Sequence, residues 1–264
     1  MTRPARRNRW LPRFGLRSLV ALVALLAVVF AWIGNARRRH DAVEALLHSN
    51  PSTRIAYDFQ REDNKYSAAA RPAGWRGWLG DHYGVDWMAA PEFVELQYPT
   101  PDDLAFLARM PSVRQLHCYR AVDLDDASIA RLAALKRLEE LWIFDGTRLS
   151  DAALVQISHC RQLRALALDL SPRMTGEGLL ALGQLKRLRK LDLQLCDSLD
   201  SPGAAVRREH LEALARALPE CQIRVTGDVE TSVNDAHLGA VRPMESSAIA
   251  LTTSGQSAHR WMAR

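Results

Sequence analysis

The sequence has 264 residues, of which 48% are hydrophobic and 25% are charged, so it is long enough to bury a sizeable core. Its Lys and Arg residues number 35 against 30 Asp and Glu, but nine of the arginines lie before His40, in a stretch that contains no acid. Residues 40–264 then have 26 basic against 30 acidic residues, a net charge of −4. The pI of about 9.3 therefore reflects the N-terminus and gives no support to nucleic-acid binding.

An unbroken apolar run begins at Leu19 and ends at Ile33. Flanking residues, among them a snorkelling Arg17, extend it to about the 17–20 residues that cross a bilayer. Six arginines precede the run and three follow it, which favours a cytoplasmic N-terminus. We expect residues 1–36 to be a basic N-terminus and a transmembrane signal anchor, with the repeats described below on the extracytoplasmic side.

Two other interpretations of this segment stay open. An apolar run of this length also suits the core of a cleaved signal peptide, and Gly34-Asn-Ala36 has the small-x-small pattern of a cleavage site. The three arginines at positions 37–39, directly after that pattern, argue against cleavage. The third interpretation is an amphipathic segment of a cytosolic protein.

Residues 37–91 are expected to form a membrane-proximal segment that ends in an N-terminal cap. Residues 40–48 predict a helix with Val43, Leu46 and Leu47 on one face, which Asn50-Pro51 ends. The alternation of Ile55, Tyr57 and Phe59 predicts a strand. Four aromatic residues follow within a short stretch, and we expect them to seal a hydrophobic core, with a ligand cage as the alternative: Trp75, Trp78, Tyr83 and Trp87.

Residues 92–226 contain a repeat with a period of 25. Seven apolar positions recur at this spacing over four periods without a miss, and units of this length stack into a solenoid. Within a period the apolar residues first step by three, as on a helix, and then alternate, as in a strand. The seven columns begin at Leu104, Leu107, Met110, Val113, Leu116, Cys118 and Leu124. Residues suited to cap a helix precede each helical part: Thr100, Asp125, Ser150 and Thr175.

The strand segments have the pattern L-x-x-L-x-L, as in Leu188-Arg-Lys-Leu191-Asp-Leu193, and they resemble the core of the leucine-rich repeat family. Cys196 lies near the Asn or Cys turn position, and Ser150-Asp-Ala-Ala-Leu154 looks like the helix start of the cysteine-containing, ribonuclease-inhibitor-like class. With its basic anchor, the chain resembles bacterial membrane-anchored leucine-rich repeat proteins. The resemblance implies an α/β solenoid, a horseshoe with parallel strands on the concave face and helices on the convex face.

Both ends of the repeat array depart from the period. The strand that contains Val94 precedes Leu116 by less than one full period, which indicates a shortened first repeat. From Leu191 to Ile223 the spacing exceeds one period, so the last repeat is longer, with its extra residues placed within 201–209. Its helix resumes at Leu211 and Leu214, and the strand of Ile223 and Val225 is expected to close the array. Residues 227–264 show no periodicity and are expected to be a disordered tail.

No motif of catalysis or cofactor binding is present in the sequence. It contains no H-E-x-x-H, Walker sequence, G-x-G-x-x-G or nucleophile elbow, so we expect no enzyme activity, no cofactor and no metal. The cysteines form no C-x-x-C pair and lie in or beside the repeat columns. We expect buried structural thiols rather than a disulfide or a metal site at Cys118, Cys160, Cys196 and Cys221.

The best candidate for function is the open face of the sheet. Positions that flank the buried leucines point away from the core, and strands lie about 4.8 Å apart, so aromatic side chains of neighbouring repeats should meet there. Aromatic residues are enriched in binding hot spots. The alternative is that the cap, the tail or the insertion covers the patch. The predicted patch and its rim are His117, Tyr119, Trp142, Phe144, Gln115, Glu140 and Asp169.

These observations favour a membrane-anchored leucine-rich repeat protein that acts as a protein-binding or scaffold module at the cell envelope, with no nucleic-acid partner. The membrane contact is the run from Leu19 to Ile33. Two alternatives remain: an enzyme or small-ligand-binding protein with its site between Trp75 and Trp87, and a purely structural surface protein.

Overall fold

The computed structural model describes residues 16–62, 65–66, 70, 72, 74, 77–78, 80, 82, 84–195, 206, 208–226 and 231–232. By its internal contacts the chain divides into two units, with the division between Val233 and Asn234. The described residues all belong to the first unit. Of the predicted disordered tail, residues 227–264, two residues are described, and they form a strand rather than disordered chain: Thr231–Ser232.

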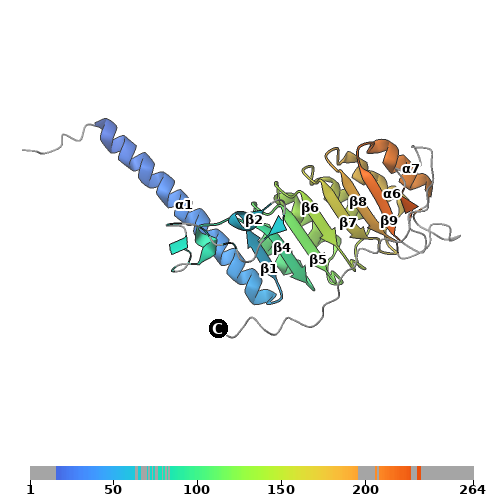
Figure 1. The fold of residues 1–264 in the computed structure, drawn as a ribbon, viewed down its shortest axis with the longest axis horizontal. Coiled ribbons are helices and arrows are strands. Elements are labelled where there is room, and N and C mark those ends of the chain that lie inside the picture. The colour runs from blue at the N-terminus through green and yellow to red at the C-terminus, as the bar shows by residue number, and fades with distance from the viewer. Residues whose placement is uncertain are drawn as a thin grey trace, which may run out of the picture. The chain divides into compact units, whose positions relative to one another are not determined.

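The central element is an eight-stranded sheet with the order β1-β4-β5-β6-β7-β8-β9-β10 (Figure 1). The strands from β4 to β9 run parallel, and the edge strands β1 and β10 pair antiparallel with their neighbours. The strands are β1 (Arg54–Tyr57), β4 (Pro91–Gln97), β5 (Gln115–Tyr119), β6 (Glu140–Ile143), β7 (Ala165–Asp169), β8 (Lys190–Gln194), β9 (Gln222–Thr226) and β10 (Thr231–Ser232).

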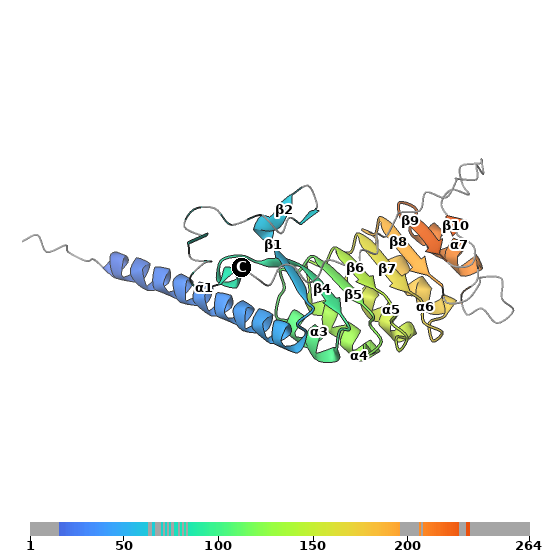
Figure 2. The same cartoon turned by 60° about the horizontal axis from the view of Figure 1, so that its bottom comes forward.

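Helices connect the parallel strands and line up along one side of the sheet, which gives a mixed α/β fold (Figure 2). They are α3 (Pro101–Leu107), α4 (Asp126–Ala130), η3 (Arg131–Ala134), α5 (Asp151–Ser158), α6 (Gly176–Leu180), η4 (Ala181–Gln184) and α7 (Arg208–Ala217). The remaining elements before β4 are α1 (Leu16–Ser49), η1 (Asp58–Gln60), the paired strands β2 (Arg61–Glu62) and β3 (Lys65–Tyr66), and η2 (Val85–Trp87).

The register of the sheet follows the sequence period. Leu116, Leu141, Leu166 and Leu191 are paired one after another across β5 to β8. Every column position among the described residues is at most 6% exposed; Leu199 lies outside the described residues. The columns therefore form the hydrophobic core between sheet and helices.

The two irregular repeats are confirmed, with one correction. Val94 pairs with Leu116 and Leu191 pairs with Ile223, as a short first and a long last repeat require. Helix α7 begins at Arg208, inside the predicted insertion, of which residues 201–205 and 207 lie outside the described residues. The correction is that β9 does not close the sheet, because β10 pairs with its outer edge.

All four predicted N-cap residues cap a helix, and two of them are also held by the preceding repeat. The carboxylate of Asp126 accepts hydrogen bonds from the backbone N and Oγ of Ser150, at 2.9 and 2.6 Å. Asp151 accepts the same pair from Thr175, at 2.7 Å each. These bonds satisfy polar groups of the N-cap residue of the later helix. They also hold the start of that helix against the start of the helix in the preceding repeat. The caps are Thr100, Asp125, Ser150 and Thr175.

Two glycines at the start of α6 are explained by packing against neighbouring helices. A Cβ atom at Gly178 would overlap the carboxylate of Asp151, and one at Gly176 would overlap the ring of His210. Glycine is needed at both positions because the side chains of the adjacent repeats approach the backbone of α6 directly.

Helix α1 is continuous from Leu16 to Ser49, so the predicted boundary between residues 36 and 37 lies inside one helix. Its last turns join the core through Ala42, Val43 and Leu46, each at most 1% exposed. Leu47, predicted on the same face, is 42% exposed, because one residue of an α-helix turns about 100° and carries it away from that face. The helix ends before Asn50, whose side-chain amide donates to the backbone oxygen of Gln97.

The cap differs from the one that the sequence predicted. Ile55 and Tyr57 lie in β1, but Phe59 lies in η1 rather than in a strand. Trp78 is 59% exposed and does not seal the core, and Trp87 is partly exposed with its ring 5.8 Å from that of His40. Trp75 and Tyr83 lie outside the described residues. Among the described residues, β1 and the last turns of α1 cover the first repeat.

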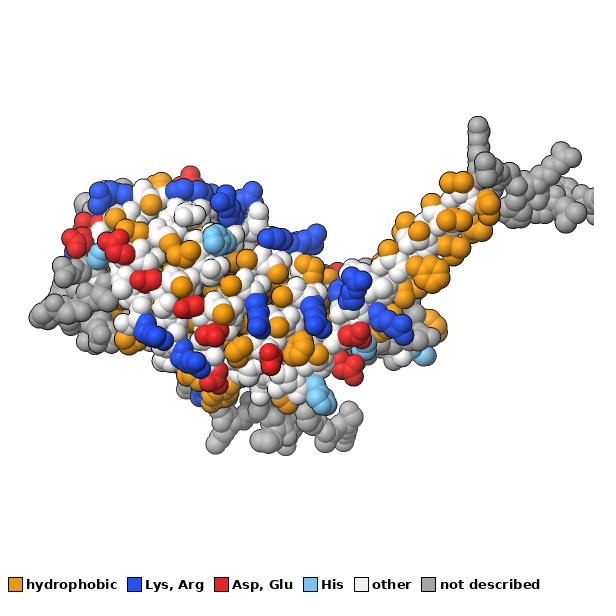
Figure 3. All heavy atoms as spheres, turned by 180° about the vertical axis from the view of Figure 1, so that it is seen from behind, with side chains coloured by type: hydrophobic (Ala, Val, Ile, Leu, Met, Phe, Trp, Pro, Cys, Tyr) orange, Lys and Arg blue, Asp and Glu red, His pale blue; other side chains and the backbone are white. Residues whose placement is uncertain are grey.

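The first half of α1 is long and apolar enough to cross a membrane, judged by length and composition. An 18-residue window within residues 19–49 has a mean hydropathy of 2.4. The large apolar side chains between Leu19 and Ile33 are exposed, and Figure 3 shows hydrophobic side chains along the visible face of this part of the helix. A continuous exposed apolar surface of this length is typical of an interaction site or of a membrane-contacting segment.

Candidate binding face of the sheet

The face of the sheet opposite the helices carries three rows of side chains, because alternate residues of each strand point to opposite faces. In the middle row Glu95 pairs with His117, His117 with Trp142, Trp142 with Ala167, and Ala167 with Asp192. The register thus brings the predicted patch residues of β5 and β6 together.

The aromatic side chains of this face form one cluster. The ring of Trp142 lies parallel to that of His117, with centroids 3.9 Å apart and 5° between the planes. The ring of Tyr119 stacks on Phe144 at 5.6 Å, and Phe144 meets Trp142 edge-on at 6.1 Å. Phe93 of β4 meets His117 edge-on at 5.0 Å. We call these five residues the aromatic cluster.

The side chains of the aromatic cluster are not fully exposed. His117 is 9% exposed, because Phe93 and Trp142 lie on either side of its ring, whereas Tyr119, Trp142 and Phe144 are partly exposed. Phe93 was not included in the patch predicted from the sequence. The shortened spacing between the first two strands could have indicated it, because that spacing places Phe93 opposite Gln115.

Acidic side chains surround the aromatic cluster. The Oε1 atom of Glu140 lies 3.4 Å from Nε2 of His117. Burial raises the pKa of the Tyr119 phenol, and the charges of Glu95 and Glu140 raise that pKa further. The carboxylates of Glu95 and Glu140 therefore place negative charge beside the Tyr119 side of the cluster.

Asp169 lies at the edge of the same face. Its Oδ2 atom accepts a hydrogen bond of 2.9 Å from the backbone N of Asp145. Burial raises the pKa of Asp169, the hydrogen bond from Asp145 opposes this, and the charge of Asp145 adds to the increase. Among the described residues, no Lys or Arg lies within 4 Å of the carboxylates of Glu140 or Asp169.

Charged residues of opposite sign alternate along the edge where the parallel strands begin. Arg114 lies 3.1 Å from Glu92 and 2.7 Å from Glu139, and Arg164 lies 3.7 Å from Glu139. Arg61 extends this row beside Glu92, at 3.5 Å. Sequence reasoning missed this row, although Arg114, Glu139 and Arg164 follow one another at the repeat period. Partly exposed ion pairs add little stability to a fold. We therefore describe this row only as the charged edge of the open sheet face.

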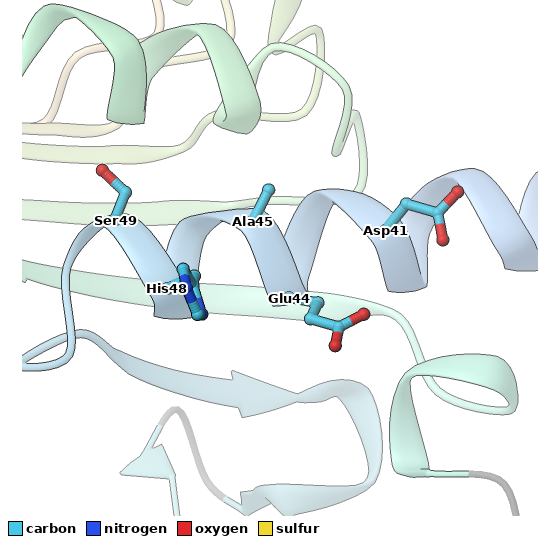
Figure 4. Close-up of a pocket in the computed structure, with 5 residues that line it drawn as sticks. All are labelled: Asp41, Glu44, Ala45, His48 and Ser49. Carbon is cyan, nitrogen blue, oxygen red and sulfur yellow. The ribbon is translucent and has the colours of Figure 1, made fainter.

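A hollow of about 550 Å³ lies beside the last turns of α1, near the segment proposed for an alternative site (Figure 4). Its described lining comes from one helix. Glu44 and His48 lie on a different side of α1 from Ala45 and Ser49, so the polar groups diverge instead of facing one another. The described residues contain no group of three or more His, Cys, Asp or Glu that could hold a metal ion. The described lining residues are Asp41, Glu44, Ala45, His48 and Ser49.

The cysteines of the described residues are buried. Burial raises the pKa of Cys118 to about 12 and the pKa values of Cys160 and Cys221 to about 11. Thiols with such pKa values are protonated at neutral pH and are poor nucleophiles and metal ligands. Cys196 lies outside the described residues.

No protein-family model matches the chain, and no curated protein matches it. Among solved structures, the chain is similar to an internalin from Listeria monocytogenes, at 17% sequence identity and a TM-score of 0.29. The match covers 47% of this chain and 37% of the internalin, so the chain spans little more than a third of that protein. A TM-score this low does not establish a common fold.

Proposed function

We propose that this chain is a membrane-anchored leucine-rich repeat protein whose open sheet face binds another protein, without catalysis. The assignment to a leucine-rich repeat solenoid is supported by L-x-x-L-x-L units that stack in register, one per sequence period. In such a horseshoe the parallel strands line the concave face and the helices the convex face, so the aromatic cluster belongs to the concave face.

The observation that carries the binding function is the aromatic cluster itself. Four of its five rings are partly exposed, the rings contact one another across neighbouring repeats, and Glu140 and Asp169 border them. A cluster of aromatic side chains with a polar border is the usual composition of a binding hot spot. Six parallel strands about 4.8 Å apart make a surface about 24 Å wide, which suits a protein partner better than a small molecule.

The continuous helix α1 supports a location at the membrane surface. Residues 19–33 would cross the bilayer with the N-terminus in the cytoplasm, and the same helix enters the core at Ala42, Val43 and Leu46. A rigid helix between membrane and sheet would hold the concave face close to the cell envelope. A partner within that envelope is therefore the expected ligand.

The experiment is site-specific photocrosslinking in the native cells. A photoreactive residue at Gln194, which is exposed at the end of β8 beyond the aromatic cluster, should trap one protein that mass spectrometry identifies. The purified partner should bind Trp142→Ala about thirtyfold more weakly or worse, as expected when a hot-spot residue is lost. Trp78→Ala is the matched control, because Trp78 is 59% exposed and lies outside the sheet. Equal binding by wild type and Trp142→Ala would exclude the aromatic cluster as the binding site.

A further inference from the structure

Exposed cations line the edge of the molecule at which the parallel strands begin. Each lies in a turn that leads from the end of a helix into the next strand, and these turns contain no Asp or Glu: residues 134–138, 159–163 and 184–188. Figure 3 shows Lys and Arg side chains along one edge of the molecule and most Asp and Glu side chains away from that edge. We call the following residues the basic edge: Lys136, Arg137, Arg161, Lys186 and Arg187.

The cations recur because the turns repeat. The backbone N–H groups of Lys136, Arg161 and Lys186 each donate to the carbonyl two residues earlier, at 3.0, 2.9 and 2.9 Å. The three side chains therefore leave the same position of successive turns, about 4.8 Å apart at the level of the strands. In the part of the chain that the structure describes, no carboxylate lies within 4 Å of Lys136, Arg137 or Arg161. Their positive charge is thus not neutralised by a direct ion pair there.

The helix dipole explains only part of this charge. It favours cations near a helix C-terminus, and the effect falls off within the last turn. One cation after each helix satisfies that preference, so it does not account for Arg137 and Arg187. The opposite edge carries the opposite sign, because the first turns of α4, α5 and α6 contain Asp126, Asp151 and Glu177. An anionic surface is therefore attracted to the edge where the strands begin.

Helix α1 leaves the sheet on the side of the basic edge. At its end, the side-chain amide of Asn50 donates to the carbonyl of Gln97, the last residue of β4, at 2.8 Å. Further back along α1, the ring of His40 lies 5.8 Å from that of Trp87, which precedes the start of β4. From Asn50 back to His40, α1 therefore runs from the strand ends to the strand starts (Figure 1). Its apolar half continues beyond the strand starts.

The basic edge lies within reach of the membrane that α1 would cross. The apolar run ends at Ile33, and the helix from Ile33 to His40, at the level of the strand starts, is about 10 Å long. The headgroup layer on each side of a bilayer is about 5–7 Å thick. The remaining distance is shorter than the Debye length of about 8 Å at physiological salt. Exposed Arg37 and Arg38 lie in the same interval.

We propose that the basic edge binds the anionic headgroups of the membrane that α1 spans. The inference rests on the membrane anchor of the proposed function and adds an orientation to it. Lysine and arginine both bind phosphate groups, and several of them along one edge contact several headgroups at once. Because α1 enters the core as one continuous helix, no flexible linker has to be ordered to bring the edge to the surface. The sheet then stands on the bilayer, and its open face stays accessible from the side to a protein partner.

Photocrosslinking in lipid nanodiscs tests the contact and its lipid preference together. The full chain is placed in nanodiscs of equal parts phosphatidylcholine and phosphatidylglycerol, with a photoreactive residue at Gln184, which is exposed and uncharged beside the basic edge. This residue should label phosphatidylglycerol at least about threefold more often than phosphatidylcholine, and added salt should reduce the ratio by screening. A photoreactive residue at Thr147, exposed near the opposite edge, should label little lipid. Equal labelling of the two lipids, or no labelled lipid at Gln184, would overturn the proposal.

Two variants of equal net charge locate the preference. Lys136→Gln with Arg137→Gln should at least halve the labelling ratio at Gln184, because two cations near the headgroups are lost in another repeat. Arg148→Gln with Arg173→Gln is the matched control, since both arginines are exposed and lie outside the basic edge. It should leave the ratio unchanged. All four side chains are exposed, so both variants should keep the melting temperature of the wild type. An equal decrease in both variants would show that net charge, and not the basic edge, attracts the lipid.

The outcomes separate this inference from the proposed function. If carbonate removes the full chain from membranes, the anchor is wrong, and this inference fails with it. If the chain stays anchored but Gln184 labels both lipids equally, the anchor stands and the lipid preference is wrong. A labelled protein in place of lipid at Gln184 would make the edge a protein-binding surface and overturn the proposal. Trp142→Ala should lose the protein partner without changing the lipid ratio, because Trp142 lies on the open face and not at the basic edge.

Discussion

Replacing Leu166 by alanine tests whether the repeat columns hold the molecule together. Leu166 lies on β7, is 1% exposed, and is flanked by Leu141 and Leu191 of the neighbouring strands. The substitution removes three carbons, which is worth about 2.4 kcal/mol at about 0.8 kcal/mol per buried carbon. The cavity adds to this loss, because hydrogen bonds to strands on both sides prevent β7 from collapsing into it. We expect a total cost of about 3–4 kcal/mol, within the range of about 2–5 kcal/mol for such changes.

Urea unfolding of the full chain in detergent, followed by circular dichroism and tryptophan fluorescence, measures this cost. The midpoint should fall by more than about 1 M while the slope stays constant. Leu180→Ala is the matched control: Leu180 is on α6 of the next repeat and 37% exposed, so its loss should cost less than about 1 kcal/mol. Equal midpoints for wild type and Leu166→Ala would refute the assignment of the columns to one continuous core.

Three further predictions follow from α1, the caps and the thiols. The full chain should stay in the membrane after carbonate washing and keep its N-terminus, whereas residues 34–264 should be soluble. An N-terminus found at Arg37 would indicate a cleaved signal instead. Asp126→Ala should lower stability by about 1–2 kcal/mol in the same urea assay, and Asp123→Ala by much less, because only Asp126 holds a cap of the next repeat. Burial raises the pKa of Cys118 from 9.0 to about 12, so the stability contribution of this protonated thiol is complete below pH 9 and is lost as the pH rises toward 12. The urea midpoint of the wild type should therefore fall between pH 9 and pH 12, and that of Cys118→Ala should fall less over the same interval.

The sequence by itself determined the repeating part of the molecule. Apolar residues one period apart must share one environment when identical units stack, so the spacing alone predicted the core and the register from β5 to β8. The helix starts were also predictable, because Thr100, Asp125, Ser150 and Thr175 need only local backbone groups to cap a turn. Local chemistry and a regular period were sufficient for these features.

Only the tertiary structure decided the ends of the array and the details of the open face. The helix α1 enters the core with Leu46 and leaves Leu47 exposed, and β1 and β10 pair antiparallel at the edges, because these contacts are made once and follow no period. The register predicted that His117 and Trp142 are neighbours. That their rings stack on one another depends on how side chains from neighbouring strands pack together, which no spacing in the sequence specifies.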